Sequence, residues 1–378
     1  MPIAVSSFNT LSAMPQERVS TLELFFDLVF VFTITQIAKL MSAAQNTGDF
    51  ASAGLILTIA WWMYGGYAWL TNSVGTDGFS RRMLLLVGMA SYFVMALAIP
   101  AATAHDGLVF GIAFAIVTMV HATLFYNASP AAARAIRGIA PFNLTAAACV
   151  IAGGLLDPRF RSLWWLGAVA MFLIATFRRR EQRFSVNPSH FAERHGLIII
   201  VALGESVVSL GSGLGSAPIG WPLVRVVVLG FSLCAAIWWT YFDGDDTRGE
   251  RALTAADPAR KLRLAILAYS YAHLGMLFGI VCIAAGLHDA IASRGGAVSA
   301  SHAWILGAGV AIYLASDKWF RWLLKIGSSR YRSAVGVIAL AAAPLGWRVN
   351  SLSQIAVLVA ALTVMLAAER RRIYFPNS

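Results

Sequence analysis

Apolar stretches of membrane-spanning length recur along almost the whole of this 378-residue chain. An α-helix needs about 20 predominantly apolar residues to cross the roughly 30 Å hydrocarbon core of a bilayer. Twelve such stretches cover residues 21–41, 53–72, 83–102, 107–126, 139–156, 162–178, 196–214, 224–243, 263–287, 303–322, 333–348 and 352–368. The sequence therefore predicts an all-α, polytopic integral membrane protein with about twelve transmembrane helices. The count is approximate because the fifth, sixth and eleventh stretches are short.

The composition supports the same class of protein. Hydrophobic residues make up 58% of the chain and charged residues only 12%, whereas soluble domains average about 45–50% and about 25%. Such a composition excludes a cytosolic enzyme, a disordered protein and a disulfide scaffold. Cys149, Cys234 and Cys282 lie inside apolar stretches without metal-ligand spacing, so they are interpreted as small buried hydrophobic residues.

The distribution of basic residues predicts the orientation of the chain. The 29 Lys and Arg exceed the 18 Asp and Glu, which gives a formal net charge of +11. With both termini cytoplasmic, 23 of the basic residues fall on the inner side and 6 on the outer side. Short cytoplasmic loops carry such an excess in membrane proteins. We therefore expect both termini in the cytoplasm and a basic inner face against anionic lipid, with no nucleic-acid partner.

Four features recur in the same order in the two halves of the chain, which indicates an internal duplication. Trp61-Trp62-Met63-Tyr64 returns as Trp238-Trp239-Thr240-Tyr241, Glu17-Arg18 as Glu193-Arg194, Arg81-Arg82 as Arg260-Lys261, and Arg178-Arg179-Arg180 as Arg370-Arg371-Arg372. Because each half has six spans, the two repeats would run parallel, about an axis along the membrane normal. Chance recurrence of common residue pairs is the alternative explanation.

This repeat divides the chain into segments. The prediction is a cytoplasmic N-terminal segment over residues 1–20, a first six-helix repeat over 21–180, a basic cytoplasmic linker over 181–195, a second six-helix repeat over 196–372, and a cytoplasmic tail over 373–378.

Two acidic residues stand four positions apart, on one face of the first predicted span. Carboxylates at a bilayer centre cost about 2.5–3.5 kcal/mol on insertion scales, so each requires a reason. Glu23 completes the sequence Ser20-Thr21-Leu22-Glu23, a capping box at a helix start, which is a structural alternative to a functional role. Asp27 lies about 9 Å into the span at 1.5 Å per residue, too deep for a cap. Its alternative role is an ion pair with Arg18 or His195.

The second half has its own candidate carboxylates. Glu205 lies near the middle of the seventh span among small residues such as Gly204 and Gly211. Small residues allow close helix packing or a break at a binding site, so either a tight interface or a functional group is possible. Asp243 follows the second Trp-Trp-x-Tyr motif and is interpreted mainly as a solvated helix end. In the repeat register Asp27 falls within two positions of Glu205, which predicts a quasi-symmetric pair.

Motifs for other chemistry are missing from the sequence. No P-loop, nucleophile elbow, dinucleotide fingerprint or HExxH pattern is present, so no cofactor, no metal site and no enzymatic activity are expected. A lone histidine inside a span, such as His121 or His273, is more often a hydrogen-bonded packing residue than a ligand.

Two sequence blocks resemble the signatures of a known family. Residues 17–32, which read ERVSTLELFFDLVFVF, resemble the opening signature of the bacterial low temperature requirement A (LtrA) family, and residues 190–206, HFAERHGLIIIVALGES, resemble its second signature. The resemblance extends along the whole chain and implies a multi-pass protein of the bacterial inner membrane. The family's name reports a growth phenotype, so the resemblance assigns no functional residues.

The leading functional hypothesis is a transporter or channel for a small solute or cation. Asp27, Glu205, Glu23, His195 and Asp243 are its candidate residues, and coupling to protons through the intramembrane carboxylates is the mechanism they suggest. The competing hypothesis is a non-transporting membrane protein that binds lipid or organises partners, in which the carboxylates only hold helices together.

Overall fold

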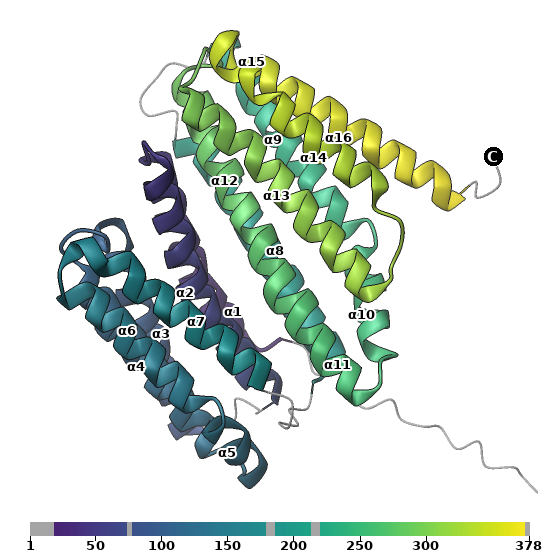
Figure 1. The fold of residues 1–378 in the computed structure, drawn as a ribbon. Coiled ribbons are helices and arrows are strands. Elements are labelled where there is room, and N and C mark those ends of the chain that lie inside the picture. The colour runs from purple at the N-terminus through teal and green to yellow at the C-terminus, as the bar shows by residue number, and fades with distance from the viewer. Residues whose placement is uncertain (1–18, 74–77, 179–185, 213–219, 375–378) are drawn as a thin grey trace, which may run out of the picture.

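The chain folds into helices, as a computed structural model of the protein describes for residues 19–73, 78–178, 186–212 and 220–374 (Figure 1). Within these residues there is no strand. The first part contains α1 (Thr21–Ser42), α2 (Thr47–Ser73), α3 (Phe79–Ala98), η1 (Ile99–Ala101), α4 (Gly107–Tyr126), α5 (Pro130–Arg137), α6 (Ala140–Leu155), η2 (Pro158–Phe160) and α7 (Arg161–Arg178). The second part contains α8 (Pro188–Ser212), α9 (Trp221–Phe242), α10 (Asp245–Thr254), α11 (Pro258–Leu264), η4 (Ala265–Ala272), α12 (His273–Ala292), α13 (Ala300–Leu324), α14 (Arg330–Ala341), α15 (Ala343–Arg348) and α16 (Ser351–Tyr374).

Helix covers the described part of all twelve predicted spans, and the all-α membrane class is confirmed. Eight helices of the described chain are long and apolar enough to cross a membrane, or nine if α5 and α6, bent by 49°, form one span. The other expected spans are not long or apolar enough to meet this criterion, for identifiable reasons. Tyrosine, tryptophan and glycine residues lower the mean hydropathy of α2. The mean hydropathy of α13 is lowered by His302, Asp317 and Lys318. A break at Ala342 makes α14 and α15 too short to span a membrane separately. The count of twelve therefore stays a prediction.

The start of α8 differs from the sequence prediction. The helix begins at Pro188 instead of residue 196, so residues 188–195, which were expected in the linker, form its first two turns. Arg194 and His195 are consequently buried helix residues, each 1% exposed. The polar contacts that this segment makes with α1 and α2 explain why a sequence of low hydropathy is held inside the bundle. Residues 1–18, 179–185 and 375–378 of the predicted terminal and linker segments lie outside the described residues.

The helices of the two parts contact one another in a similar order. In the first part α1 contacts α2 and α3, α3 contacts α4, α4 contacts α6, α6 contacts α7, and α7 returns to α2. In the second part α8 contacts α9 and α12, α12 contacts α13, α13 contacts α14, α14 contacts α16, and α16 returns to α9. Gly279 of α12 and Gly309 of α13 permit close contact, since a Cβ at either would lie within 2.9 Å of the partner backbone.

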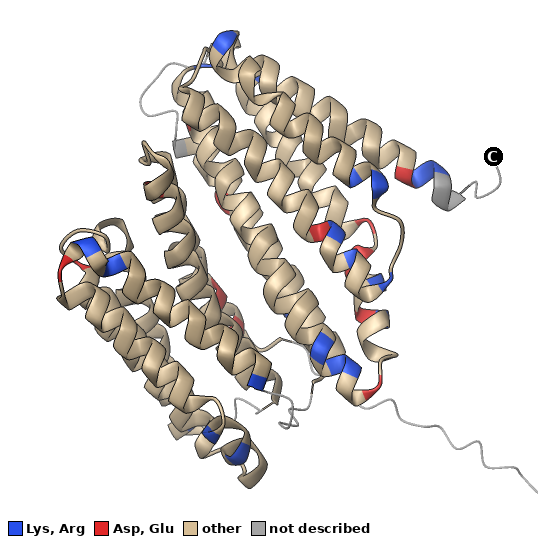
Figure 2. Ribbon diagram, viewed as in Figure 1, with Lys and Arg blue, Asp and Glu red and all other residues tan. Residues whose placement is uncertain are grey.

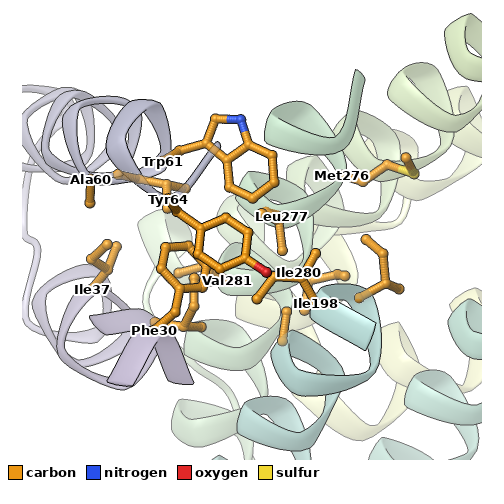
Figure 3. Close-up of a cluster of buried hydrophobic side chains, with 14 of the residues drawn as sticks. Phe30, Ile37, Ala60, Trp61, Tyr64, Ile198, Met276, Leu277, Ile280 and Val281 are labelled. Carbon is orange, nitrogen blue, oxygen red and sulfur yellow. The ribbon is translucent and has the colours of Figure 1, made fainter. Parts of the chain in front are cut away.

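The two parts meet along α1 and α2 on one side and α8 and α12 on the other (Figure 1). Phe30 and Tyr64 from the first part pack beside Ile198, Ile280 and Val281 from the second, and all five are essentially inaccessible to solvent (Figure 3). This apolar contact surrounds the polar groups described below. Burial among such side chains makes every unpaired charge at this interface energetically costly.

Candidate functional site

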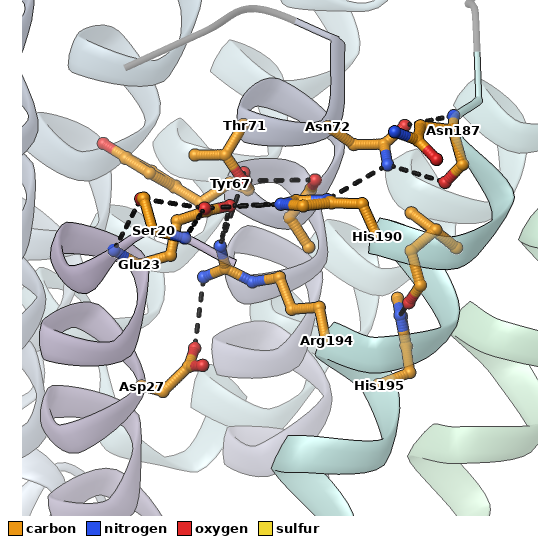
Figure 4. A network of polar contacts seen from close by, with 12 residues as sticks. Ser20, Glu23, Asp27, Tyr67, Thr71, Asn72, Asn187, His190, Arg194 and His195 are labelled. Atoms are coloured by element: carbon orange, nitrogen blue, oxygen red, sulfur yellow. Dashed lines mark hydrogen bonds and ion pairs between the residues drawn. The ribbon is translucent and has the colours of Figure 1, made fainter. Parts of the chain in front are cut away.

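Arg194 connects the two parts of the molecule through a buried ion-pair cluster (Figure 4). Its Nη1 lies 2.6 Å from Glu23 Oε1 and its Nη2 lies 3.1 Å from Asp27 Oδ1. Nη1 also donates to the Thr71 hydroxyl at 3.0 Å, and the Tyr64 hydroxyl donates to Asp27 Oδ1 at 2.9 Å. α1, α2 and α8 are thus held together by one guanidinium.

Glu23 also closes the first turn of α1. The Ser20 backbone N–H donates to Glu23 Oε2 at 2.8 Å, and the Glu23 N–H donates to the Ser20 hydroxyl at 3.3 Å. This is the reciprocal capping box that the sequence predicted. The capping-box interpretation of Glu23 is therefore confirmed, and the cap fixes the carboxylate where Arg194 reaches it.

The hydrogen bonds around His190 determine its tautomer. The Asn72 side-chain Oδ1 accepts from the Asn187 N–H at 3.0 Å, which places the Asn72 NH₂ group 3.2 Å from His190 Nδ1. An amide NH₂ can only donate, so Nδ1 must be an acceptor, and the proton of a neutral imidazole is assigned to Nε2. Nε2 lies 3.2 Å from Glu23 Oε1 and donates to that carboxylate.

The cluster consequently has more negative than positive groups. Among the described residues, Glu23 and Asp27 are two carboxylates, Arg194 is the one guanidinium that pairs with them, and His190 is neutral in the tautomer that its partners impose. Asp27 Oδ2 has no hydrogen-bond partner among the described residues, although its side chain is only 4% exposed. With both carboxylates ionised, one negative charge is uncompensated within the described chain, and Asp27 Oδ2 is the atom where a proton or cation would balance it.

Glu205 lies at a second level of the same interface. Its Oε2 accepts a short hydrogen bond from the Thr35 hydroxyl of α1, and its Oε1 accepts from Ser209 one turn along α8 at 3.2 Å. The side chain is buried, and no ion pair involves it among the described residues. The glycines beside it do not mediate tight packing with the described residues, because a Cβ at Gly204 or Gly211 would meet none of their atoms within 4 Å.

Asp27 and Glu205 belong to separate groups of contacts. Glu205 lies level with Thr35, eight residues and thus about 12 Å along α1 from Asp27. The structure therefore brings Asp27 together with Glu23, and it does not bring Asp27 together with Glu205.

Two other candidates lie away from the cluster. His195 donates its Nδ1–H to the Phe191 carbonyl, 2.8 Å away, and its ring faces Tyr269 and His273 at centroid distances of 5.4 and 5.2 Å. Asp243 is exposed at the end of α9, with Arg370 3.8 Å away, as expected for a solvated helix end. Arg18, the other predicted partner of Asp27, lies outside the described residues.

Sequence reasoning missed the central cation of the cluster. His190 and Arg194 are spaced i, i+4 on α8 and so share the face that meets α1 and α2. Tyr64 belongs to the first Trp-Trp-x-Tyr motif, whose recurrence indicates the repeat but not a contact with Asp27. The available signal was the occurrence of an arginine and a histidine at helical spacing directly before an apolar run.

A second ion-pair network lies in the second part and was also missed. Three arginines contact three carboxylates: Arg248, Arg321 and Arg332 pair with Asp245, Asp317 and Glu369, which join α10, α13, α14 and α16. The ion-paired groups here are equal in number, in contrast to the cluster around Arg194. Removal of one partner from such a buried network leaves an uncompensated charge, so this network is interpreted as structural.

A cavity of about 70 Å³ lies between α2, α4, α6, α7 and η4. Trp61 and Trp62 line it, and the Trp61 Nε1–H donates to the Ser270 carbonyl of η4 at 2.8 Å. Residues Ala265–Ala272 form a π-helix, a geometry that often occurs at functional sites. Trp61 also packs against Tyr64 at a centroid distance of 5.3 Å. The side chains of Trp61 and Tyr64 therefore connect the cavity to Asp27.

Metal binding finds no support in the described residues, which contain no group of three or more His, Cys, Asp or Glu side chains able to hold an ion. The polar chemistry of the interface is therefore that of carboxylates, one guanidinium, hydroxyls and a neutral imidazole.

Comparison with known proteins shows which family the chain belongs to. The chain is 27% identical over 324 residues to an uncharacterized protein of Rhizobium meliloti (strain 1021), an alignment that covers 81% of this chain and 78% of that protein. The family model of the bacterial low temperature requirement A protein (LtrA) matches residues 18–368. That range includes both ends of the interface cluster, from Glu23 to Arg194. The chain therefore belongs to the bacterial low temperature requirement A (LtrA) family of membrane proteins.

Proposed function

We propose that this protein is a transporter for a small solute or cation, driven or gated by a proton that binds at Asp27. The observation that carries the proposal is the charge imbalance at the interface: two buried carboxylates share one guanidinium, and Asp27 Oδ2 lacks a partner among the described residues. Intramembrane ionisable groups of this kind mark ion and proton pathways.

Protonation of Asp27 would change the contacts between the two parts of the molecule. A neutral Asp27 no longer attracts Arg194, whose guanidinium then pairs only with Glu23. The groups that face Asp27 are Glu23 on its own helix, Tyr64 on α2 and Arg194 on α8. A weaker link between α1 and α8 at this level permits relative movement of the two parts, which is how alternating access works in transporters built from repeats.

The cavity beside Trp61 is the proposed solute site. Its walls are largely aromatic and aliphatic, with Asn143 and the Ser270 carbonyl as polar groups, a combination typical of small-molecule sites. The volume of about 70 Å³ limits a solute in this conformation to a few heavy atoms. The contacts from the cavity through Trp61 and Tyr64 to Asp27 would couple solute binding to protonation of Asp27. We propose no catalytic chemistry for this protein.

The proposed membrane arrangement is twelve spans in two parallel repeats with both termini cytoplasmic, in the bacterial inner membrane. Three observations support it. The two parts have matching orders of helix neighbours. α1 and α8 run in the same direction, since Glu23 contacts Arg194 while Thr35 contacts Glu205, with intervals of twelve and eleven residues. Basic residues gather at the ends of α5, α11 and α13 that would face the cytoplasm (Figure 2).

Proteoliposomes loaded with a pH-sensitive dye test the proposal. We expect the wild-type protein to accelerate internal pH change when a potassium or a sodium gradient is imposed, relative to protein-free vesicles. Asp27→Asn and Glu205→Gln should each reduce the rate to the protein-free level. Asp243→Asn is the matched control, because it removes an acid that is exposed at a helix end, and it should retain the wild-type rate.

A second readout follows the proton itself. Infrared difference spectra between acidic and alkaline pH should contain a protonated-carboxyl band that Asp27→Asn removes and Asp243→Asn does not. Equal flux in wild type, Asp27→Asn and Glu205→Gln would contradict the transport mechanism.

The non-transporting alternative has one observation in its favour. Arg194 pairs with both Glu23 and Asp27, which is also the arrangement of a structural lock between helices. Destabilised Asp27→Asn protein without any loss of flux or of the infrared band would favour that alternative.

A further inference from the structure

A basic cavity of about 570 Å³ opens between α11, η4 and the C-terminal end of α13. Its volume is within the range of about 300–1,000 Å³ that is usual for ligand pockets. Three of its basic residues, Arg260, Arg263 and Lys325, are exposed, and a fourth, Arg321, is buried. No acidic residue of the described chain lines it. Figure 2 shows the Lys and Arg residues gathered over α11 at this end of the second part.

The exposed basic side chains of this cavity have no carboxylate partner within the described chain. Arg260, Arg263 and Lys325 take part in none of the ion pairs found there, in contrast to Arg248, Arg321 and Arg332 of the neighbouring network. Unpaired guanidinium and ammonium groups on one wall favour an anion with several acceptor oxygens.

Arg321, which lines the cavity, has a buried donor without an acceptor among the described residues. Arg321 is 5% exposed, its Nη1 contacts Asp245 and Glu369, and its Nη2 donates to the Ser328 carbonyl at 3.1 Å. Its Nε, however, has no partner among the described residues. A buried N–H without an acceptor is costly, so an oxygen of a bound ligand would satisfy it.

Glycine at position 327 keeps the cavity open beside this donor. Gly327 has a φ of +141°, which L side chains rarely adopt, and a Cβ there would lie 2.8 Å from Arg321 Nη2. Lys325 closes α13 in the left-handed conformation, with a φ of 59°, and lines the cavity. The local backbone therefore positions both basic groups.

The rim of the cavity is apolar. Trp322 is 70% exposed, and Leu264, Leu267 and Leu323 complete the lining. Exposed tryptophans of membrane proteins gather at the level of the lipid headgroups. A basic wall next to an aromatic and aliphatic rim matches the two halves of a phospholipid.

We propose that this cavity binds the headgroup phosphate of an anionic phospholipid, with its acyl chains along Trp322 and Leu267. Basic pockets between transmembrane helices on the cytoplasmic side bind acidic headgroups of this kind. The proposal commits to lipid because the rim offers apolar contacts that a free anion cannot use. It does not depend on the proposed transport activity.

Thermal unfolding of the full-length protein in nanodiscs tests the site. Nanodiscs that contain phosphatidylglycerol should raise Tm relative to nanodiscs of phosphatidylcholine alone, because a ligand that binds the native state stabilises it. The triple variant R260Q/R263Q/K325Q should lose most of this shift, with an affinity loss on the order of a hundredfold at low salt, about fivefold per basic residue.

The double variant R134Q/R137Q is the control. It removes two exposed arginines from α5, on the side also predicted to be cytoplasmic, and should retain the full shift. All variants should have the wild-type Tm in phosphatidylcholine, since the substituted side chains are exposed. An undiminished shift in the triple variant would overturn the proposal. So would an equal shift in phosphatidylcholine nanodiscs supplied with inorganic phosphate, because the cavity would then be a free-anion site.

Discussion

At the scale of single residues, the protein depends on one guanidinium that serves two carboxylates. Arg194 is 1% exposed and contacts Glu23, Asp27 and Thr71. Hydrogen bonds to charged groups are stronger than neutral ones, and the loss of one member leaves the others buried without compensation. The contribution of Arg194 therefore exceeds that of any exposed arginine of the chain.

Arg194→Leu should destabilise the protein by about 3–5 kcal/mol, since two carboxylates lose their cation. Denaturant-induced unfolding in detergent measures this change. Arg225→Leu, at an exposed position of α9, is the control and should have little effect. Adding Glu23→Gln and Asp27→Asn to Arg194→Leu should restore much of the stability, and a triple variant no more stable than the single one would show that charge is not the cause.

The residue scale also explains which parts of the site were predictable. The capping box of Glu23 depends on four consecutive residues, so the sequence revealed it. The partner of Asp27 depends on how α8 meets α1. The spacing of His190 and Arg194 marks a polar face of α8 but does not show which helix that face meets. Asp243 is the candidate that the sequence suggests after α9, whereas the buried carboxylate there is Asp245. This difference follows from the turn at Gly244, which precedes α10 and directs Asp245 towards Arg321 and Arg332.

At the scale of elements, α1 and α8 are joined twice. The lower link, near the N-terminal end of α1, is the Arg194 cluster. The upper link, further along α1, is the hydrogen bond between Thr35 and Glu205. The apolar stretches of spanning length predicted both helices, although they placed the start of α8 eight residues too late because His190, Glu193 and Arg194 lower the hydropathy there. The π-helix between α11 and α12 could not be predicted, since nothing in its composition distinguishes it from an α-helix.

Thr35→Val should cost about 1–3 kcal/mol, because it removes a donor from a buried carboxylate. Thr363→Val is a suitable control, since Thr363 is exposed and bonds only to the Val359 carbonyl of its own helix. Unfolding in detergent measures both. The double variant Thr35→Val/Glu205→Gln should lose less than the sum of the single changes, and strict additivity would mean that the two residues do not interact.

At the scale of the whole molecule, the all-α membrane class followed from composition and span length, whereas the arrangement of spans did not. Hydropathy alone identifies eight or nine spans in the described chain, because α2 and α13 contain aromatic, small or charged residues that only packing against other helices accommodates. The matching order of helix neighbours in the two parts and the shared direction of α1 and α8 support the proposed count of twelve spans.

Single-cysteine labelling tests this arrangement. In a variant without Cys149, Cys234 and Cys282, a cysteine at His105, between α3 and α4, should react with a membrane-impermeant maleimide in intact bacterial cells with a permeabilised outer membrane. A cysteine at Thr254, before α11, should react only after the inner membrane is opened. Labelling of both from outside would refute the proposed orientation.

The double connection between α1 and α8 limits how the two parts can shift. Translation of α1 by one turn would replace Thr35 with Val31 or Lys39 opposite Glu205 and would break the contacts of Arg194 at the same moment. Rotation about the upper connection, in contrast, separates only the lower one. If the molecule changes conformation, α1 should therefore act as a lever that pivots at Thr35, with its N-terminal end travelling furthest.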